Sequence, residues 1–405
     1  MRLWRVPYPK FGAGPGLDRV SMIAERLGID LAGFGADGAV IVGSNGKGST
    51  AAMTAALLAQ VNPDVGLFTS PHLVALNERF RIGDEDIGDD ELETHWERVA
   101  AAAEATGQTN TLGGFEFLFL IAADWFTARG CAHTVWEAGI GGRLDPVRLI
   151  AARRLALTSL DLEHTALLGD TLEAIAREKI DAAPLGARLY VSESCEPQRA
   201  AIEAHCTERG VSAMFVPADP MRLALLTGAH QRRNAALALA LARDLAPVSD
   251  AQVDAGFSAT RWPGRLEVIN QAPLVVIDVG HTPAAIDAAL AGFQDMKVRR
   301  DAILVCGASH DKDPSALVAR LAPHFSTIIC AAARHKGAPA AEVAAYAVDA
   351  NGDAEIVVAD SVAEARRLAL ARGEDKAIYV AGGLFLAAEF KAVHLGRDPA
   401  LLAFF

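Results

Sequence analysis

Positive charge is not concentrated anywhere in this sequence. The 405 residues include 38 Lys and Arg against 50 Asp and Glu, which gives a formal net charge of -12 at pH 7, and the basic residues are scattered along the chain. A face that binds nucleic acid or an anionic membrane surface needs a basic patch. We therefore expect small-molecule partners, with no nucleic acid and no membrane.

Cysteines and long apolar runs are also scarce. The N-terminus has no apolar core of signal-peptide length, and the most apolar internal stretch, FEFLFLIAADWF at 115–126, is short and interrupted by charge. The five cysteines lie far apart without a C-x-x-C pair, so neither a disulfide framework nor a zinc site is indicated; they are Cys131, Cys195, Cys206, Cys306 and Cys330. These absences predict a location in the reducing cytoplasm.

Short β-branched segments alternate with Ala- and Leu-rich segments of helical period, which predicts parallel βαβ units in a sheet covered on both faces. Pro263 and Gly264 in RWPGRLEV break both helix and strand, and we place a domain junction there. The predicted class is α/β, with a mostly parallel P-loop-type sheet domain at 1–265 and a smaller Rossmann-like α/β domain at 266–405. The expected strands are 38–43, 64–68, 133–137, 153–160 and 187–191, then 273–278, 301–306, 326–330, 354–358 and 376–380.

The stretch VGSNGKGST, at 42–50, has the features of a phosphate-binding loop. Its three glycines lie between an expected strand and a helix that we expect to begin near Ser49, so backbone N–H groups can converge on an anion at a positive helix end. Lys47 would add a positive charge on a terminal phosphate. The usual spelling G-x-x-x-x-G-K-[ST] is not matched, because Ile41 stands at the first glycine position and Gly48 follows the lysine. An ordinary glycine-rich turn is the alternative, and the ordered coincidence of strand, glycines, lysine and hydroxyls favours phosphate.

Polar side chains follow three other expected strands of the first domain. Ser70 and His72 follow 64–68, Glu137 ends 133–137, and Glu163 and His164 follow 153–160. Doubly wound sheets bind ligands outside the carboxyl ends of their strands. A few such ligands, completed by phosphate oxygens and water, suit Mg²⁺. Each residue taken singly has an ordinary role, as a turn residue, a strand-end charge or a solvated histidine; together they predict a site for a magnesium triphosphate.

Lys179 lies in an expected helix, GDTLEAIAREKI, for which we predict Asp170 as N-cap and Glu173 as its capping-box partner. Helical spacing places the lysine on one face with Leu172, Ile175 and Ala176. Burial lowers the pKa of a lysine, and a partly neutral amine can react with CO₂ to form a carbamate that helps to hold a metal. Snorkelling of the side chain along the helix end is the alternative.

Together these residues resemble the Mur ligase superfamily and, within it, the folylpolyglutamate synthase and dihydrofolate synthase family. The similarity covers nearly the whole chain. It rests on PGLDRV (15–20), SNGKGST (44–50), TSPHLVALNERFRIG (69–83), EAGIGGRLD (137–145), LEHTALLGDTLEAIAREK (162–179), QRRNAA (231–236), RWPGRLEV (261–268), DVGHTP (278–283), GASHDKD (307–313) and GGLFL (382–386).

The resemblance implies a role for each matching position. The ATP phosphates would be held by the loop residues Asn45, Gly46, Lys47, Gly48, Ser49 and Thr50. The Mg²⁺ ligands would be Ser70, Glu137 and His164, with Lys179 as the carbamylated lysine, and a monovalent cation is a further family feature. Adenine, terminal phosphate and ribose would be contacted by Asn234, Arg265 and Asp278, and the amino acid would enter near His281. The pterin-acid pocket would be formed by Gly16, Leu17, Asp18, Arg19, Phe115, Arg143, Leu144 and Asp145.

The implied chemistry is amide formation from a poorly electrophilic carboxylate. ATP phosphorylates the acceptor acid, the amino group of L-glutamate attacks the acyl phosphate, and phosphate leaves, with Lys47, Lys179, Arg265 and His281 as the expected catalytic residues. The acceptor would be dihydropteroate or a folate carboxylate. The family is commonly monomeric, and its second domain closes over the first, which fits a hinge at RWPGR.

Departures from the family pattern concern the acceptor. The chain reads GGRLDPVRL where members usually read GGRLDATN, and DVGHTP where they read DGAHNP, so Pro146 and Thr282 are unusual; the threonine that often precedes Phe115 is missing, and the interval between Lys179 and Asn234 is short. A divergent paralogue that ligates an amino acid to another carboxylate is therefore the alternative. A nucleotide switch or transporter ATPase would need a motif such as N-K-x-D, which is absent, and a kinase would leave the second domain without a role.

Overall fold

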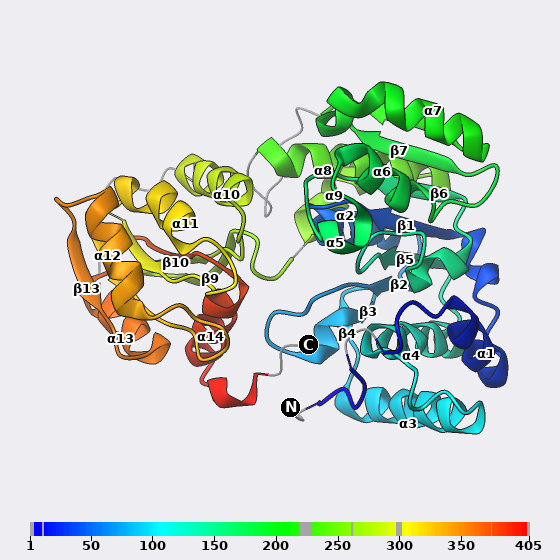
Figure 1. Cartoon of the computed structure of the whole chain (residues 1–405), viewed down its shortest axis with the longest axis horizontal. Coiled ribbons are helices and arrows are strands. Elements are labelled where there is room, and N and C mark those ends of the chain that lie inside the picture. The colour runs from blue at the N-terminus through cyan, green and yellow to red at the C-terminus, as the bar shows by residue number, and fades with distance from the viewer. Residues whose placement is uncertain are drawn as a thin grey trace.

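The computed structural model describes residues 4–9, 12–218, 229–260, 262–296, 302–373 and 375–402. Its strands form two separate sheets, which lie in two lobes (Figure 1). The larger sheet uses residues 38–216 and the smaller one residues 267–381. The larger sheet thus ends before the predicted junction at 265, and the smaller sheet begins after it.

The larger sheet has eight strands in the order β4-β3-β2-β5-β1-β6-β7-β8. Six run parallel, and β3 and β4 form an antiparallel extension next to β2. Every residue of the central strand β1 is buried, as expected for an apolar strand covered on both faces. The strands are β1 Gly38–Val42, β2 Val65–Phe68, β3 Phe80–Ile82, β4 Glu85–Asp86, β5 His133–Glu137, β6 Arg154–Leu157, β7 Arg188–Ser192 and β8 Ser212–Val216.

Helices cover both faces of this sheet, each over its own apolar cluster. One cluster centres on Phe68, Phe119 and Trp136, and the other on Met53 and Leu237. The helices of the first cluster are α1 Leu17–Leu27, α3 Asp89–Ala105, α4 Gly114–Arg129, α6 Leu172–Ile180 and α7 Arg199–Arg209; those of the second are α2 Lys47–Ala59, α8 Ala229–Leu245 and α9 Asp250–Ala259. Short helical turns complete the domain: α5 Thr165–Leu168, η1 Ala32–Gly35, η2 Leu76–Arg79, η3 Pro146–Ile150 and η4 Glu193–Gln198.

The smaller sheet has six strands in the order β13-β12-β11-β14-β10-β9, and only the edge strand β9 is antiparallel. Its helices again pack on both faces, with Tyr379 stacked on Phe293 in one of the two clusters. The strands are β9 Glu267–Gln271, β10 Leu274–Ile277, β11 Ile303–Cys306, β12 Thr327–Cys330, β13 Glu355–Val358 and β14 Ile378–Ala381. The helices are α10 Pro283–Asp295, α11 Pro314–Leu321, α12 Ala340–Ala350, α13 Val362–Arg372 and α14 Leu384–His394, with the turns η5 Ala322–His324 and η6 Pro399–Leu401.

The α/β class and the ten predicted strands are confirmed, and two helix starts are corrected. Helix α2 begins at Lys47, two residues before the expected start, with Gly46 as its left-handed N-cap. The N-cap of α6 is Thr171, whose hydroxyl accepts the amide of Ala174, so the predicted cap at Asp170 is wrong. Within the described ranges, no helix is both long and apolar enough to span a membrane. Most of the segment MRLALLTGAH (221–230), which belongs to the short interval between Lys179 and Asn234, lies outside the described residues.

Candidate active site

The phosphate loop joins β1 to α2 and is enclosed by parts of the chain far away in sequence. Gly46 has a φ of 87°, and a Cβ at this position would lie 2.5 Å from Oδ1 of Asn234 on α8. A Cβ at Gly48 would collide with the ring of Trp262. Glycine suits both positions, because the loop is closed in by helix α8, which packs against α2, and by the segment that leads to the second domain.

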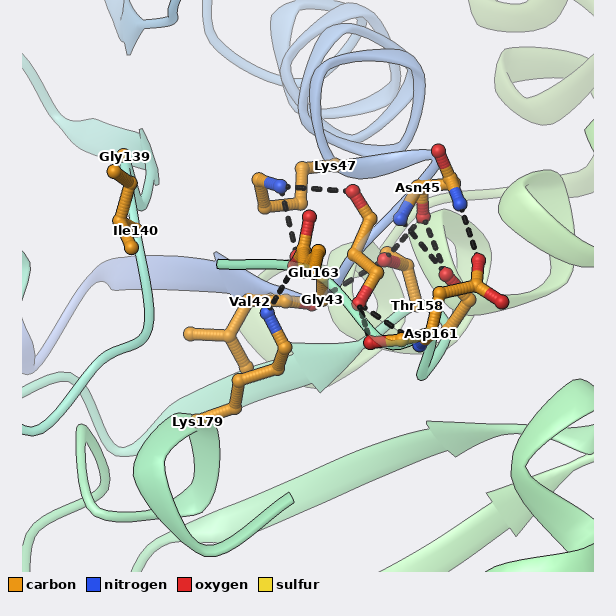
Figure 2. Close-up of polar contacts among 12 residues, drawn as sticks. Val42, Gly43, Asn45, Lys47, Gly139, Ile140, Thr158, Asp161, Glu163 and Lys179 are labelled. Atoms are coloured by element: carbon orange, nitrogen blue, oxygen red, sulfur yellow. Dashed lines mark hydrogen bonds and ion pairs between the residues drawn. The ribbon is translucent and has the colours of Figure 1, made fainter. Parts of the chain in front are cut away.

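A dense hydrogen-bond network joins the phosphate loop to the β6–α5 loop (Figure 2). The amides of Ser44 and Asn45 donate to the carbonyl and the hydroxyl of Ser159, at 3.0 and 2.8 Å. Thr158 Oγ1 donates to the carbonyl of Asn45 at 2.6 Å. Asn45 Nδ2 donates to Asp161 Oδ2 at 2.5 Å, and the amide of Asp161 donates to Ser44 Oγ at 3.0 Å. The two loops therefore form one structural unit.

Lys47 and Thr50 supply a charge and a free hydroxyl to this unit. The ammonium of Lys47 donates to the carbonyls of Gly43 and Ser44, at 2.7 and 3.1 Å, so its positive charge is held over the loop. Oγ1 of Thr50 is buried and has no hydrogen-bond partner in the described part of the chain. Ser49 Oγ instead accepts a hydrogen bond from Gln231 on α8, at 3.3 Å. A buried hydroxyl without a partner, in the same loop as a lysine ammonium, is an arrangement that a phosphate or a metal ion can complete.

Glu137 ends β5, the strand next to β1, and is only 4% exposed. Its Oε2 accepts the amide of Ser70 at 2.8 Å, so two of the three predicted metal ligands lie together. Burial raises the pKa of Glu137 to about 7, although Lys47, the Ser70 amide, Arg265 and Arg79 each act to lower this pKa. A buried carboxylate with too little compensating charge fits a divalent cation.

His164, the third predicted ligand, is exposed on the β6–α5 loop and has a left-handed backbone, with a φ of 46°. No group of three or more His, Cys, Asp or Glu side chains able to hold a metal ion is found among the described residues. The predicted set contains only two side chains of those types. These few protein ligands fit Mg²⁺, which keeps water and phosphate oxygens as its other ligands. The metal assignment of Ser70, Glu137 and His164 stays a prediction.

A buried cluster behind Glu137 was missed in the sequence. Arg79 Nε donates to His72 Nδ1 at 3.0 Å, and burial lowers the pKa of Arg79 to about 10 against the opposing charges of Glu137 and Glu78. Glu78 accepts the amides of three successive residues, Leu73, Val74 and Ala75, at 2.7 to 3.0 Å. These contacts fix the loop that carries the Ser70 amide. His72 was singled out from the sequence, whereas Glu78 and Arg79 occur in the motif ALNERF, and their role depends on tertiary packing.

Lys179 is buried, as its helical position predicts, with a side chain 1% exposed. Its Nζ donates to Glu163 Oε1 at 2.8 Å (Figure 2). Burial lowers the pKa of Lys179, the charge of Lys47 lowers this pKa further, and Glu163 acts in the opposite direction. Snorkelling is excluded by the burial, whereas carbamylation of the amine stays a prediction.

The predicted nucleotide contacts surround the junction between the lobes. Asn234 donates to Gln231 Oε1 at 3.0 Å, and Gln231 in turn donates to Ser49 Oγ, so both lie next to the phosphate loop. Gln231 was not predicted. Asp278 is buried and accepts the amides of Leu266 and Gly280, at 3.1 and 2.7 Å. Burial raises the pKa of Asp278, and the charge of Arg265 opposes this rise, as it does at Glu137. Arg265 therefore acts electrostatically on carboxylates of both lobes.

His281 follows Asp278 at the start of the second lobe. Its side chain is half-buried, and its Nδ1 lies 3.2 Å from the carbonyl of Val279. Burial lowers the pKa of His281, so the ring is mainly neutral at neutral pH. A neutral imidazole can accept a proton.

The predicted acceptor pocket divides into inward and outward residues. Arg19 forms a two-bond ion pair with Glu116 on α4, at 2.7 and 2.8 Å, and Glu116 also accepts the amide of Gly113. Glu116 was not among the predicted pocket residues. Gly16 is the N-cap of α1, which begins at Leu17, and Asp18 in its first turn is exposed.

The loop at 139–145 is organised by Asp145. This buried carboxylate accepts the amides of Gly139, Ile140 and Val147, at 2.9 to 3.2 Å, and burial raises its pKa to about 6. The ring of Phe115 lies directly over Gly139, where a Cβ would be 2.9 Å from it. Asp145 and Phe115 therefore shape the loop from inside.

Arg143 and Leu144 of the same loop point outward. Arg143 pairs with Glu178 of α6 at 2.7 Å, and the side chain of Leu144 is 41% exposed. Arg19, Phe115 and Asp145 thus belong to one packed region, and Arg143 and Leu144 lie at its surface. The assignment of the pocket stays a prediction.

Comparison with known proteins agrees with this geometry. Residues 264–384 match the family described as Mur ligase, glutamate ligase domain. The fold is similar to E. coli FolC in complex with DHPP and ADP, with a TM-score of 0.81 and 27% identity over 94% of this chain and 93% of that one. The chain belongs to the Mur ligase superfamily. A Mycobacterium tuberculosis folylpolyglutamate synthase complexed with ADP and AMPPCP gives a TM-score of 0.84 and 25% identity over 95% of this Mur ligase chain and 96% of the other.

Relatives by sequence are also folylpolyglutamate synthases. A probable bifunctional folylpolyglutamate synthase/dihydropteroate synthase of Halobacterium salinarum is 33% identical over 94% of this Mur ligase chain and 49% of its own length. The chain thus spans about half the length of that relative. A folylpolyglutamate synthase of Lacticaseibacillus casei is 29% identical over 88% of this chain and 89% of its own.

Proposed function

We propose that this Mur ligase is an ATP-dependent ligase that joins L-glutamate to a carboxylate through an acyl phosphate, as a dihydrofolate synthase, a folylpolyglutamate synthase or both. The observation that carries the proposal is the convergence of Lys47, Glu137, Glu163 and Lys179 on one phosphate loop. Support comes from relatives: one bifunctional folylpolyglutamate synthase/dihydrofolate synthase was solved with Mn, AMPPNP and L-glutamate bound, at 26% identity and a TM-score of 0.80.

The first step transfers the γ-phosphoryl group of ATP to an oxygen of the acceptor carboxylate, which releases ADP. The loop amides from Gly46 to Ser49 and the ammonium of Lys47 would bind the phosphates, because the amides of Asn45 and Thr50 already donate within the protein, and Arg265 would neutralise the terminal phosphate. A divalent cation at Glu137 and Ser70, completed by His164, would neutralise charge that develops on the phosphate oxygens. Asn234 and Asp278 would orient the nucleoside.

The second step forms the amide. The ammonium of L-glutamate would lose a proton to neutral His281, a role supported by the burial that lowers the pKa of this ring at the start of the second lobe. The amine attacks the acyl carbon, the C–O bond to phosphate breaks, and inorganic phosphate leaves. Closure of the second lobe about residues 261–265 would bring the amine to the acyl phosphate and exclude water.

Two of the four departures from the family pattern, at Pro146 and Thr282, have a local structural reason. Pro146 is the first residue of η3, a position where its missing N–H costs nothing, and Asp145 caps the same turn. Thr282 is the N-cap of α10, and its hydroxyl accepts the amide of Ala285 at 3.3 Å. These capping roles explain the two changes without a different acceptor, so we favour a pterin or folate carboxylate. We also propose that the chain acts as a monomer in the cytoplasm.

The test is a phosphate-release screen in which carboxylates are crossed with amino acids. Dihydropteroate and tetrahydrofolate are each combined with L-glutamate, with Mg²⁺ and ATP present. We expect turnover only when both the acid and the amino acid are supplied. Full-rate ATP hydrolysis with no acceptor would contradict the ligase assignment. Turnover that occurs with an amino acid and a different carboxylate, and not with dihydropteroate or tetrahydrofolate, would select the divergent paralogue.

A further inference from the structure

We propose that Asp161 is a positioning residue for the nucleotide phosphates, acting through Asn45. This inference rests on the proposed function, because it concerns the loop that would bind ATP. Asp161 has no place in the reaction outlined above. Its side chain reaches back from the β6–α5 loop to the side-chain amide of Asn45, one residue before Gly46, the N-cap of α2 (Figure 2).

Ser159 and Thr158 hold the backbone of Asn45, and Asp161 makes two further links between the loops. The Asn45 amide is held by Ser159 Oγ, and the Asn45 carbonyl accepts from Thr158 Oγ1. Asp161 holds the Asn45 side chain through its carboxylate and Ser44 Oγ through its own amide. The contact between Asp161 and the Asn45 side chain therefore adds to the hold on the loop N–H groups, and anion binding depends on the direction of these groups.

The same loop also fixes the lysine site. Glu163 lies two residues after Asp161 and accepts from Lys179 Nζ at 2.8 Å. A displacement of the loop at Asp161 would move the partner of Lys179 as well as the phosphate loop. Asp161 thus sets the spacing between the phosphate loop and Lys179.

The charge of Asp161 and its positioning role predict opposite changes in nucleotide affinity when the carboxylate is removed, so the direction of the change tests the inference. Asp161 is exposed and brings a negative charge close to the expected polyphosphate. By charge alone, its removal should strengthen nucleotide binding. A positioning role predicts weaker binding instead, because Asn45 loses the acceptor that holds it.

The experiment measures the affinity of AMPPNP with Mg²⁺ by calorimetry for the full chain and its variants. We expect Asp161→Ala to weaken binding by about five- to tenfold, the size of one lost hydrogen bond. Asp161→Asn keeps an acceptor oxygen without the charge, and should bind as tightly as the unmodified chain or more tightly. Asp170→Ala, which removes an exposed carboxylate nine residues further on, is the matched control and should show no loss.

A double-mutant cycle tests the contact itself. Asn45→Ala should weaken binding to a similar extent, and Asn45→Ala with Asp161→Ala should be no weaker than either single variant. The KM for L-glutamate should stay unchanged in Asp161→Ala. Unchanged or tighter AMPPNP binding in Asp161→Ala, or additive losses in the cycle, would overturn the inference alone; failure of the unmodified chain to bind AMPPNP would overturn the ligase assignment together with it.

Discussion

Replacement of Glu137 by glutamine should stabilise the fold in a pH-dependent way. The pKa of this carboxyl is about 7 in the folded chain, because burial outweighs the favourable charges of Lys47, Arg265 and Arg79, against an ordinary value of 4.5. Both states bind the proton below pH 4.5. Between the two pKa values only the folded state keeps it, so stability is lost as the pH rises towards 7.

The magnitude follows from the difference of about 2.5 pKa units, from 7 minus 4.5. At about 1.4 kcal/mol per unit, ionised Glu137 costs about 3 kcal/mol of folding free energy above pH 7. Glutamine has nearly the same shape, keeps an oxygen for the Ser70 amide and never ionises. Glu137→Gln should therefore match the unmodified chain near pH 4.5 and exceed it by about 3 kcal/mol near pH 8.

The assay is urea unfolding without nucleotide or divalent cation at several pH values from 5 to 8. Glu173→Gln, at an exposed position on α6, is the control and should leave the pH profile unchanged. A stability gap between Glu137→Gln and the unmodified chain that stays constant over this range would refute the reasoning. Activity of Glu137→Gln should nevertheless be lost, because the same carboxylate is proposed to hold the metal.

Three other substitutions probe the remaining parts of the site. Gly46→Ala should lower AMPPNP affinity by about tenfold or more in calorimetry, because alanine is strained at a φ of 87° and its Cβ would meet Asn234; wild-type affinity would contradict the loop geometry. Glu163→Gln leaves Lys179 buried without a charged partner and should destabilise the fold by about 1–3 kcal/mol in urea unfolding, a range reduced because Glu163 is 27% exposed. Adding Lys179→Met to this variant should recover part of the lost stability. A further, additive loss of stability in the double variant would refute the pairing. Glu116→Gln should raise the KM for the acceptor acid about tenfold through loss of its hold on Arg19, with the KM for ATP unchanged; an equal rise in both would place Arg19 outside the acceptor pocket.

Most of the strands that the sequence pattern predicts are buried on both faces, and the exception is β13, a partly exposed edge strand. β1 and β11 are fully buried and consist of continuous apolar residues. The strands that were missed lie at sheet edges or are very short: β8 and β9 are half-exposed with mixed polarity, and β3 and β4 have three and two residues. Edge strands owe their existence to the neighbour they pair with, which a local pattern does not contain.

The candidate site was predictable where position in the fold determines it. Strand ends predicted Ser70 and Glu137, and helical spacing predicted the burial of Lys179. The partners of these residues were not predictable, because they come from distant segments: Glu163 reaches Lys179 from 16 residues away, and Gln231 reaches Ser49 from 182 residues away. Thr171 also replaces its neighbour as N-cap, since both residue types can accept the same amide.

The sheet order explains why one site collects these groups. The strands β2, β5, β1 and β6 are adjacent and parallel, each about 4.8 Å from the next. Ser70 follows β2, Glu137 ends β5, the phosphate loop follows β1 and Glu163 follows β6. Glu137 lacks enough positive charge in the folded chain, whereas Lys47 donates its hydrogen bonds to two neutral carbonyls and acts on Glu137 and Glu163 only through its charge. A divalent cation would supply what Glu137 lacks, and a polyphosphate would supply what Lys47 lacks. Each ligand therefore completes the charge balance that the other needs, so metal and nucleotide should bind with positive coupling rather than independently.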